Sequence, residues 1–273
     1  MAYDDFDKPS NRTPLIWAAI AVAAAGLGGW LYWRSHHELL PTMPASAQPE
    51  AAAPAQETRI EHPLPASPDD AANAPLPELN DSDKAIAGAL GNAASGSALA
   101  QYLVPESVIR HIVVTVDNLP RQKIAVDKRP VTPAAGTFVA DGDELHATLD
   151  KRNYQRYEPM MEVIRKADMQ RFAAVYLRFY PLFQKAYQDL GYPTGYFNDR
   201  LVKVIDMLLA TPQITGPIEL TRPNVMYVFA DPKLEALPAG QKLLIRMGAD
   251  DATAVKAKLM ELRAIITAAP PGR

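Results

Sequence analysis

The sequence predicts an α+β fold: a predominantly α-helical soluble domain with small β-hairpins, preceded by one transmembrane helix and a disordered linker. Three features predict it: an uncharged apolar stretch near the N-terminus, a stretch rich in proline and alanine after it, and apolar residues at helical spacing through most of the remainder. The predicted order is a short cytoplasmic tail at 1–14, an anchor helix at 15–33, a linker at 34–77, the soluble domain at 78–268 and a C-terminal tail at 269–273.

Composition excludes several classes of protein. A formal net charge of -3, from 28 basic and 31 acidic residues, gives no long-range field that favours nucleic acid, so nucleic acid is not an expected partner. The absence of cysteine excludes a disulfide framework, a thiolate zinc site and a cysteine nucleophile. The run His36-His37-Glu38 has no second ligand group at the usual spacing, and neither a metal nor a cofactor is predicted.

Residues 15–33 predict the membrane anchor. As a helix these uncharged residues span about 28 Å, close to the thickness of about 30 Å of a bilayer's hydrocarbon core. Aromatic side chains such as Trp17 and Trp33 lie towards its ends, where membrane interfaces favour them. A cleaved signal peptide is the rival interpretation, but the small-residue site at 45–47 lies too far from a run that is already too long. Membrane lipid is therefore an expected partner.

The charges beside the anchor predict its orientation. Lys8 and Arg12 precede it and Arg34 follows it, which favours a cytoplasmic N-terminus. In a bacterium the anchor would then lie in the inner membrane and the large domain in the periplasm. Small residues one turn apart would allow two anchor helices to pack, although alanine also fills ordinary spans, so a homodimer stays an alternative. These small residues are Ala21, Ala25 and Gly29.

The linker contains nine prolines between Pro41 and Pro77 and almost no side chains that a core could bury. We expect it to stay unfolded and to reach on the order of 120 Å when fully extended. The domain behind it can then work well away from the bilayer.

Most elements of the domain are predicted to be helices. Asp168 is expected to cap a long helix, which Pro181 should kink or restart and which Gly191 should end. Asn198 or Asp199 is expected to cap the following helix. The other predicted elements are a helix opened by 81–83, a helix through 108–116 with a strand as the alternative, an irregular β excursion over 121–150, a hairpin around 222–224, a short helix opened by 231–232, and helices over 239–247 and 251–266.

A set of short motifs resembles the bacterial family known as domain of unknown function 3014. The likeness covers most of residues 78–268; Pro120 departs from it, since a small residue would be expected there. The resemblance implies a bacterial source, membrane anchoring and a mainly helical domain. It brings no assigned activity, so no catalytic residue can be carried over. The motifs are Val116-Asp117-Asn118-Leu119, Arg156-Tyr157-Glu158-Pro159, Tyr180-Pro181-Leu182, Leu190-Gly191-Tyr192-Pro193, Phe197-Asn198-Asp199-Arg200-Leu201, Phe229-Ala230-Asp231-Pro232 and Gly240-Gln241-Lys242-Leu243-Leu244.

The motifs of common enzyme classes are missing from the sequence. It contains no G-x-S-x-G, H-E-x-x-H, phosphate-binding loop or dinucleotide fingerprint, and His111 and His146 are far apart within the domain. A binding or scaffold domain is therefore favoured over an enzyme. The alternative is a carboxylate-dependent hydrolase of cell-envelope glycans, because two acids brought together by folding can flank a glycosidic bond. The candidate acids are Asp117, Asp199, Asp206, Asp231 and Glu235.

Tyrosine and arginine are concentrated in residues 154–196, a stretch that contains seven of the eleven tyrosines. Aromatic faces and guanidinium groups suit a groove for an envelope protein or for peptidoglycan. We expect Arg200 to pair either with an internal acid such as Asp231 or Glu235, or with a ligand carboxylate. The predicted ligand-binding residues are Arg156, Tyr157, Tyr192, Tyr196, Asn198 and Arg200, and no catalytic residue is assigned.

Overall fold

The computed structural model describes residues 59–65, 75–94, 99–143 and 146–268. The predicted anchor at 15–33 and both predicted tails lie outside these residues. None of the helices that the structure describes is long and apolar enough to cross a membrane. The described part is mostly helical and carries one small four-stranded antiparallel sheet, which confirms the prediction of a mainly helical domain with small β-hairpins.

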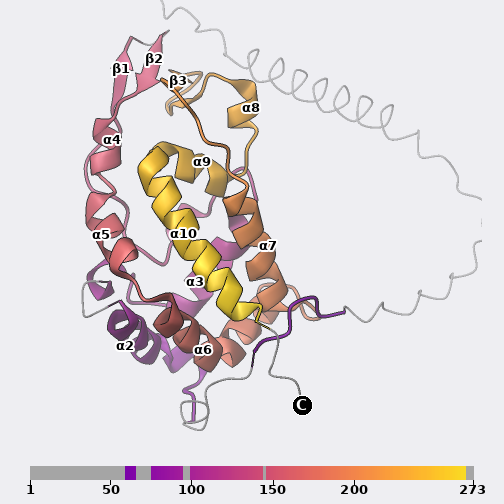
Figure 1. The fold of residues 1–273 in the computed structure, drawn as a ribbon. Helices are drawn as coiled ribbons and strands as arrows, with labels where there is room; N and C mark the ends of the chain where they lie inside the picture. Colours follow the sequence, from indigo (N-terminus) through magenta and orange to yellow (C-terminus); the bar gives the residue numbers. More distant parts are fainter. Residues whose placement is uncertain (1–58, 66–74, 95–98, 144–145, 269–273) are drawn as a thin grey trace, which may run out of the picture. The chain divides into compact units, whose positions relative to one another are not determined.

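Figure 1 shows the helices, with the sheet at one end of them and α2 and α6 at the other. Three 3-10 turns, Leu79–Asp81, Ala100–Tyr102 and Val126–Lys128, also lie within the described chain. The helices are α2 (Asp83–Ala93), α3 (Val108–Asn118), α4 (Arg152–Gln155), α5 (Glu158–Lys166), α6 (Met169–Asp189), α7 (Phe197–Leu209), α8 (Pro232–Glu235), α9 (Ala239–Met247) and α10 (Ala249–Ile266).

The sheet joins two hairpins that are distant in sequence. Its strands are β1 (Ala140–Gly142), β2 (Ala147–Leu149), β3 (Glu219–Thr221) and β4 (Val228–Phe229), each antiparallel to the next. In the register, Ala147 lies opposite Leu220, which lies opposite Phe229. These three side chains are buried, and Ile245 of α9 packs in the same cluster. The predicted hairpin around 222–224 is confirmed. Among the described residues of the predicted β excursion over 121–150, only β1 and β2 are strands.

Helix α6 carries the aromatic core. Phe183 of α6 stacks on Phe197 of α7 with parallel rings 5.8 Å apart, and Tyr187 packs against the same Phe197. Helices α2 and α3 cover α6 with aliphatic side chains, among them Val113. The alternative of a strand over 108–116 is wrong, because these β-branched residues form one amphipathic helix whose apolar side is buried.

Helix α10 lies between α5 and α7 and also contacts α6 and α9 (Figure 1). The C-terminal end of the described chain therefore packs against helices from the middle of the sequence. Ile266, in the last turn of α10, is fully buried with Val202 and Ile205 of α7. Its N-terminus is set by Gly248, whose φ of 95° ends α9 and begins α10 within one residue.

Local capping explains several boundaries that the sequence predicts. The Asp168 carboxylate accepts hydrogen bonds from two backbone amides of α6, and Asp231 accepts one from Lys233 at the start of α8. Gly191, with φ 114°, follows α6 as expected. Pro181 does not restart a helix, because α6 runs through it without interruption.

The predicted cap of α7 is wrong. The helix begins at Phe197 and is preceded by Tyr196, so Asn198 and Asp199 lie inside its first turn and are buried. Two side chains of α6 occupy the first amides instead: Gln184 accepts from the Phe197 amide at 2.9 Å, and the Tyr180 hydroxyl accepts from the Asn198 amide at 3.4 Å. The helix therefore needs no cap from its own residues.

Candidate functional site

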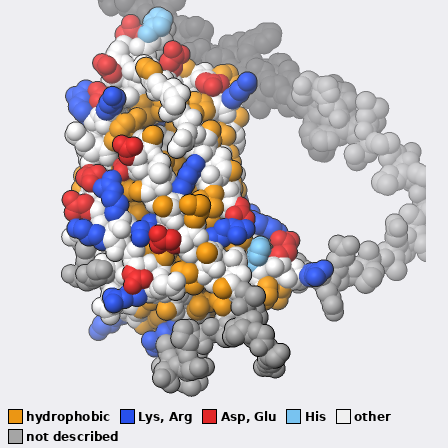
Figure 2. All heavy atoms as spheres, in the orientation of Figure 1, with side chains coloured by type: hydrophobic (Ala, Val, Ile, Leu, Met, Phe, Trp, Pro, Cys, Tyr) orange, Lys and Arg blue, Asp and Glu red, His pale blue; other side chains and the backbone are white. Residues whose placement is uncertain are grey.

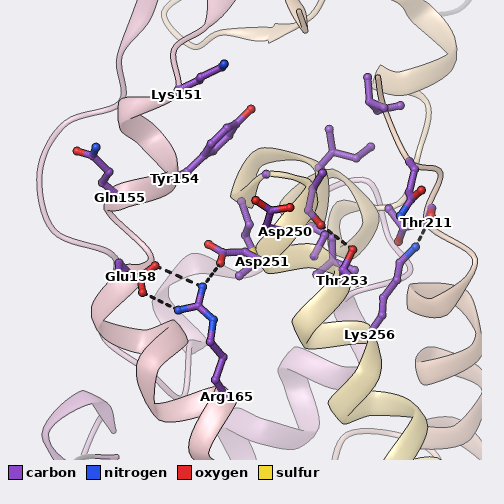
Figure 3. A pocket seen from close by; sticks show the side chains of 18 of the residues that line it. Lys151, Tyr154, Gln155, Glu158, Arg165, Thr211, Asp250, Asp251, Thr253 and Lys256 are labelled. Carbon is purple, nitrogen blue, oxygen red and sulfur yellow. Dashed lines mark hydrogen bonds and ion pairs between the residues drawn. The ribbon is translucent and has the colours of Figure 1, made fainter. Parts of the chain in front are cut away.

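A cleft of about 950 Å³, lined by both polar and apolar side chains, lies beside the first turn of α10 (Figure 3). One wall is formed by α4 and α5, and the other by residues 211–218, which link α7 to β3. The α9–α10 junction forms the floor, and the 3-10 turn at 100–102 contributes two further side chains. The cleft thus draws its lining from four stretches that are far apart in sequence.

Gly248 and Tyr154 set the floor of the cleft. A Cβ atom on Gly248 would lie only 3.0–3.1 Å from three ring atoms of Tyr154, so the ring of α4 packs directly on the backbone where α10 begins. Burial raises the pKa of the Tyr154 hydroxyl above its ordinary value, which makes the phenolate form still less accessible. This contact fixes α4 relative to α10 and so fixes the width of the cleft.

An ion-pair network crosses the cleft below Tyr154. The Arg165 guanidinium lies 2.5 Å from Glu158 Oε1 and 2.6 Å from Asp251 Oδ1, and so bridges α5 and α10. The Asp251 side chain is only 8% exposed. Burial raises the pKa of Asp251, with a smaller contribution from the nearby Glu158 charge, while Arg165 opposes the shift. Asp251 is thus a partly desolvated carboxyl group beside a second carboxylate.

The remaining charges face the open part of the cleft. Lys256 of α10 donates a hydrogen bond to the Thr211 carbonyl at 2.5 Å and so closes the far wall. Lys151, Gln155 and Asp250 are exposed and are among the residues that line the cleft. Both signs of charge are therefore available to a ligand, together with an amide and a tyrosine ring.

This arrangement suits binding. Among the described residues, no three acidic or histidine side chains gather closely enough to hold a metal ion. No histidine, serine or cysteine is among the residues that line the cleft, so a Ser-His or Cys-His pair is not part of the lining. Figure 2 shows acidic and basic side chains interspersed over the face it draws, rather than gathered into a patch of one sign.

Arg156 and Tyr157, two of the predicted ligand-binding residues, lie beside the cleft but do not line it. The Arg156 guanidinium donates to the carbonyls of Ala135, at 2.9 Å, and Gly136, at 3.1 Å, so it holds the loop before β1. Tyr157 precedes α5 and packs against a cluster that contains Met161. Their sequence neighbours at 154, 155 and 158 provide the lining instead.

Arg200 and Tyr192 lie in a different place, at the end of α3. Arg200 Nη2 lies 3.0 Å from Asp117 Oδ1 and donates to the Asp117 carbonyl at 2.7 Å. Tyr192 stacks on Tyr187 with ring centroids 4.6 Å apart, and its hydroxyl lies 3.4 Å from Asp117 Oδ2. Arg200 therefore pairs with an acid of its own chain, which is one of the two predicted alternatives for this arginine. The acid is Asp117 rather than Asp231 or Glu235.

Tyr196 and Asn198, the last two predicted residues, face another part of the chain. The Tyr196 hydroxyl accepts a hydrogen bond from the Leu64 amide at 3.4 Å, and the Asn198 side chain donates to the His62 carbonyl at 2.8 Å. The six predicted residues therefore do not form one site.

The five candidate acids of the hydrolase alternative do not converge on the cleft, and none lines it. Asp117 is buried in the last turn of α3 and pairs with two arginines. The other four also have partners: Asp199 the amides of residues 61 and 62, Asp206 Arg263, Asp231 the Lys233 amide, and Glu235 Lys242.

Sequence reasoning missed the cleft because no local pattern marks it. Its charged residues occur as ordinary helix-surface residues, and its walls meet only through tertiary packing. The one local sign is Gly248, where two helices meet with no intervening loop, so that the first turn of α10 opens on the cleft.

Comparison with known families places the chain. A family model described as "Protein of unknown function (DUF3014)" matches residues 108–263, from the start of α3 to the last turns of α10. This stretch is more than half of the chain, so the chain belongs to this family, as its sequence motifs indicate. The match includes all the lining of the cleft except residues 101 and 102. No curated protein and no solved structure matches the chain.

Proposed function

We propose that this protein is a single-pass inner-membrane protein that presents a binding domain to the periplasm and takes an envelope protein or peptidoglycan in the cleft. The observation that carries the proposal is the cleft itself, whose volume of about 950 Å³ is that of a large ligand site. Arg165 forms ion pairs with Glu158 and Asp251, and Lys256 donates a hydrogen bond to a backbone carbonyl, so these groups connect the walls of the cleft. Lys151 and Asp250 remain exposed at the opening.

The chemistry of the opening favours a ligand that carries peptide groups. Lys151 offers an ammonium group to a carboxylate, Asp250 offers a carboxylate to an amine, and Gln155 can both donate and accept hydrogen bonds. Tyr154 adds a ring surface against which an apolar or sugar group can pack. Peptides and the peptide-bearing glycan of the bacterial wall both present this combination.

The membrane part of the proposal rests on residues 15–33 and on the basic residues before them. A reporter fused after residue 270 tests the orientation. We expect alkaline phosphatase to be active there and a fluorescent protein that folds only in the cytoplasm to be dark. The reverse pair of results would place the domain in the cytoplasm and contradict the proposal.

Co-sedimentation with purified peptidoglycan tests one of the two ligand classes. The variant Lys151→Ala/Asp250→Ala removes two of the exposed charged side chains that line the cleft, whereas Lys84→Ala, on the exposed side of α2 outside the cleft, is the control. We expect the double variant to sediment less than the wild type and the control to behave like the wild type. Sedimentation that the double variant leaves unchanged would exclude the cleft as the peptidoglycan site.

A glycan hydrolase remains the alternative, and one observation favours the cleft as its catalytic site. Asp251 has a raised pKa and lies near Glu158, an arrangement that can serve as an acid and a base. Zymography of the purified chain separates the two functions. The binding proposal predicts no clearing of the peptidoglycan, whereas a clearing band that Asp251→Asn abolishes would establish the hydrolase.

A further inference from the structure

Residues 59–65, which we call the docked segment, lie against the first turn of α7. The Asp199 carboxylate accepts hydrogen bonds from two consecutive amides of this segment, from His62 at 2.7 Å through Oδ1 and from Glu61 at 3.1 Å through Oδ2. The Asn198 side chain donates to the His62 carbonyl at 2.8 Å. Three hydrogen bonds therefore hold the backbone of the segment, whatever its side chains are.

Two side chains of the segment add to this contact. Leu64 packs against the aromatic core cluster of α6 and α7, and its amide lies 3.4 Å from the Tyr196 hydroxyl. Glu61 pairs with Lys203, one turn further along α7, at 3.1 Å, although both side chains are more than half exposed and the pair contributes little. The docked segment is thus held by hydrogen bonds to its backbone, which we call the clamp, and by the packing of one apolar side chain.

The clamp is held in place by the fold. Asn198 is fully buried, and its side chain accepts from the Tyr176 hydroxyl at 3.0 Å and donates to the Ile266 carbonyl at 3.3 Å. Because Gln184 and Tyr180 of α6 occupy the first amides of α7, the side chains of Asn198 and Asp199 are free to serve the segment. This explains why two good capping residues do not cap their own helix.

We propose that the first turn of α7 is a peptide-binding site whose ligand is the chain's own docked segment, which bends at residues 61 and 62 and is recognised through its backbone and through Leu64. Residues 59–65 fall within the predicted linker, and for them the expectation of an unfolded tether is corrected. If the anchor proposed above is present, docking leaves about 25 residues between membrane and domain instead of about 44. The greatest reach then falls from about 120 Å to about 80 Å.

A protease binds the residues that flank the cleaved bond in an extended conformation, which the docked segment cannot adopt. The rate of trypsin cleavage after Arg59, measured on the full chain in detergent micelles, therefore tests the site. His62→Pro removes the amide that Asp199 accepts, whereas His62→Ala keeps it and removes only the side chain. Each rate is divided by that of a synthetic peptide spanning residues 55–67 with the same substitution, which removes any direct effect of proline on trypsin.

We expect His62→Ala to be cleaved at the wild-type rate and His62→Pro about tenfold faster, the size expected for one hydrogen bond to a charged acceptor. Asp199→Ala should match His62→Pro, with cleavage after Lys84 in α2 measured alongside to detect unfolding. Equal rates for the two His62 variants would overturn the proposal, whatever Asp199→Ala does. This result is independent of the cleft and of the anchor.

Discussion

Arg200→Ala is the substitution whose effect the structure defines best. Arg200 shares the carboxylate of Asp117 with Arg121, which lies 2.6 Å from the other oxygen. The Asp117 side chain is only 2% exposed, whereas the side chains of Arg200 and Arg121 are 28% and 56% exposed. The two arginines therefore bind the same buried acid from a half-buried and an exposed position.

The magnitude follows from burial. Removal of one partner from a buried ion pair costs about 3–5 kcal/mol, because a charge is left without compensation. Two features reduce this cost for Arg200: Arg121 stays beside the acid, and the 3.0 Å contact is an ion pair without hydrogen-bond alignment, since Asp117 Oδ1 and the buried Arg200 Nε have no hydrogen-bond partner. The hydrogen bond to the Asp117 carbonyl is lost as well. We expect a loss of about 2–3 kcal/mol.

Thermal unfolding measures this loss. For a domain of this size, 1 kcal/mol corresponds to about 2–4 °C, so Arg200→Ala should lower Tm by about 5–10 °C. Arg121→Ala is the matched control, because it removes an arginine from the same carboxylate at an exposed position, and its Tm should stay within about 2 °C of the wild type. An unchanged Tm for Arg200→Ala would refute the structural role of Arg200. It would reopen the interpretation that this arginine binds a ligand.

Two further predictions concern backbone strain and pH. Gly248→Ala should destabilise the domain by about 1–3 kcal/mol, because of the positive φ and the close Tyr154 ring. Gly88→Ala, in open space within α2, should stabilise it by about 0.5–1 kcal/mol; a scan of Tm for both variants checks the pair. Burial opposes ionisation of Glu235, but hydrogen bonds from Lys242 and from a backbone amide together lower the pKa of its carboxyl group below the ordinary value of 4.5. The ionised Glu235 carboxylate therefore stabilises the fold above that pH, and this stabilisation is lost as the pH falls. Glu235→Gln should therefore lower Tm at pH 7, and the gap to the wild type should narrow below about pH 4; a gap independent of pH would contradict this.

Where the physics is local, sequence reasoning located the elements. The helix at 239–247 is found to the residue, because Gly248 ends it through its own backbone conformation. Asp168 and Asp231 cap their helices through bonds to residues two or three positions away. Such contacts can be read from a short stretch of sequence.

Where distant residues compete for the same group, sequence reasoning failed. Asn198 and Asp199 have the composition of a helix cap, but Gln184 and Tyr180 from α6 occupy the amides that a cap would serve. The acid that pairs with Arg200 lies 83 residues before it and could not be chosen among several candidates. The cleft combines both problems, since its walls are assembled from segments up to 155 residues apart, from Gln101 to Lys256.

Site-specific photocrosslinking in intact cells tests most directly the claim that the cleft takes an envelope ligand. A photoreactive phenylalanine analogue replaces Gln155, which is exposed on the cleft wall, and in a second strain it replaces Lys84 on α2, outside the cleft. The proposal predicts a discrete adduct with an envelope protein or with peptidoglycan from position 155, none from position 84, and loss of the adduct when Asp250→Ala is added. The same adducts from both positions, or an adduct from 155 that Asp250→Ala leaves intact, would contradict it.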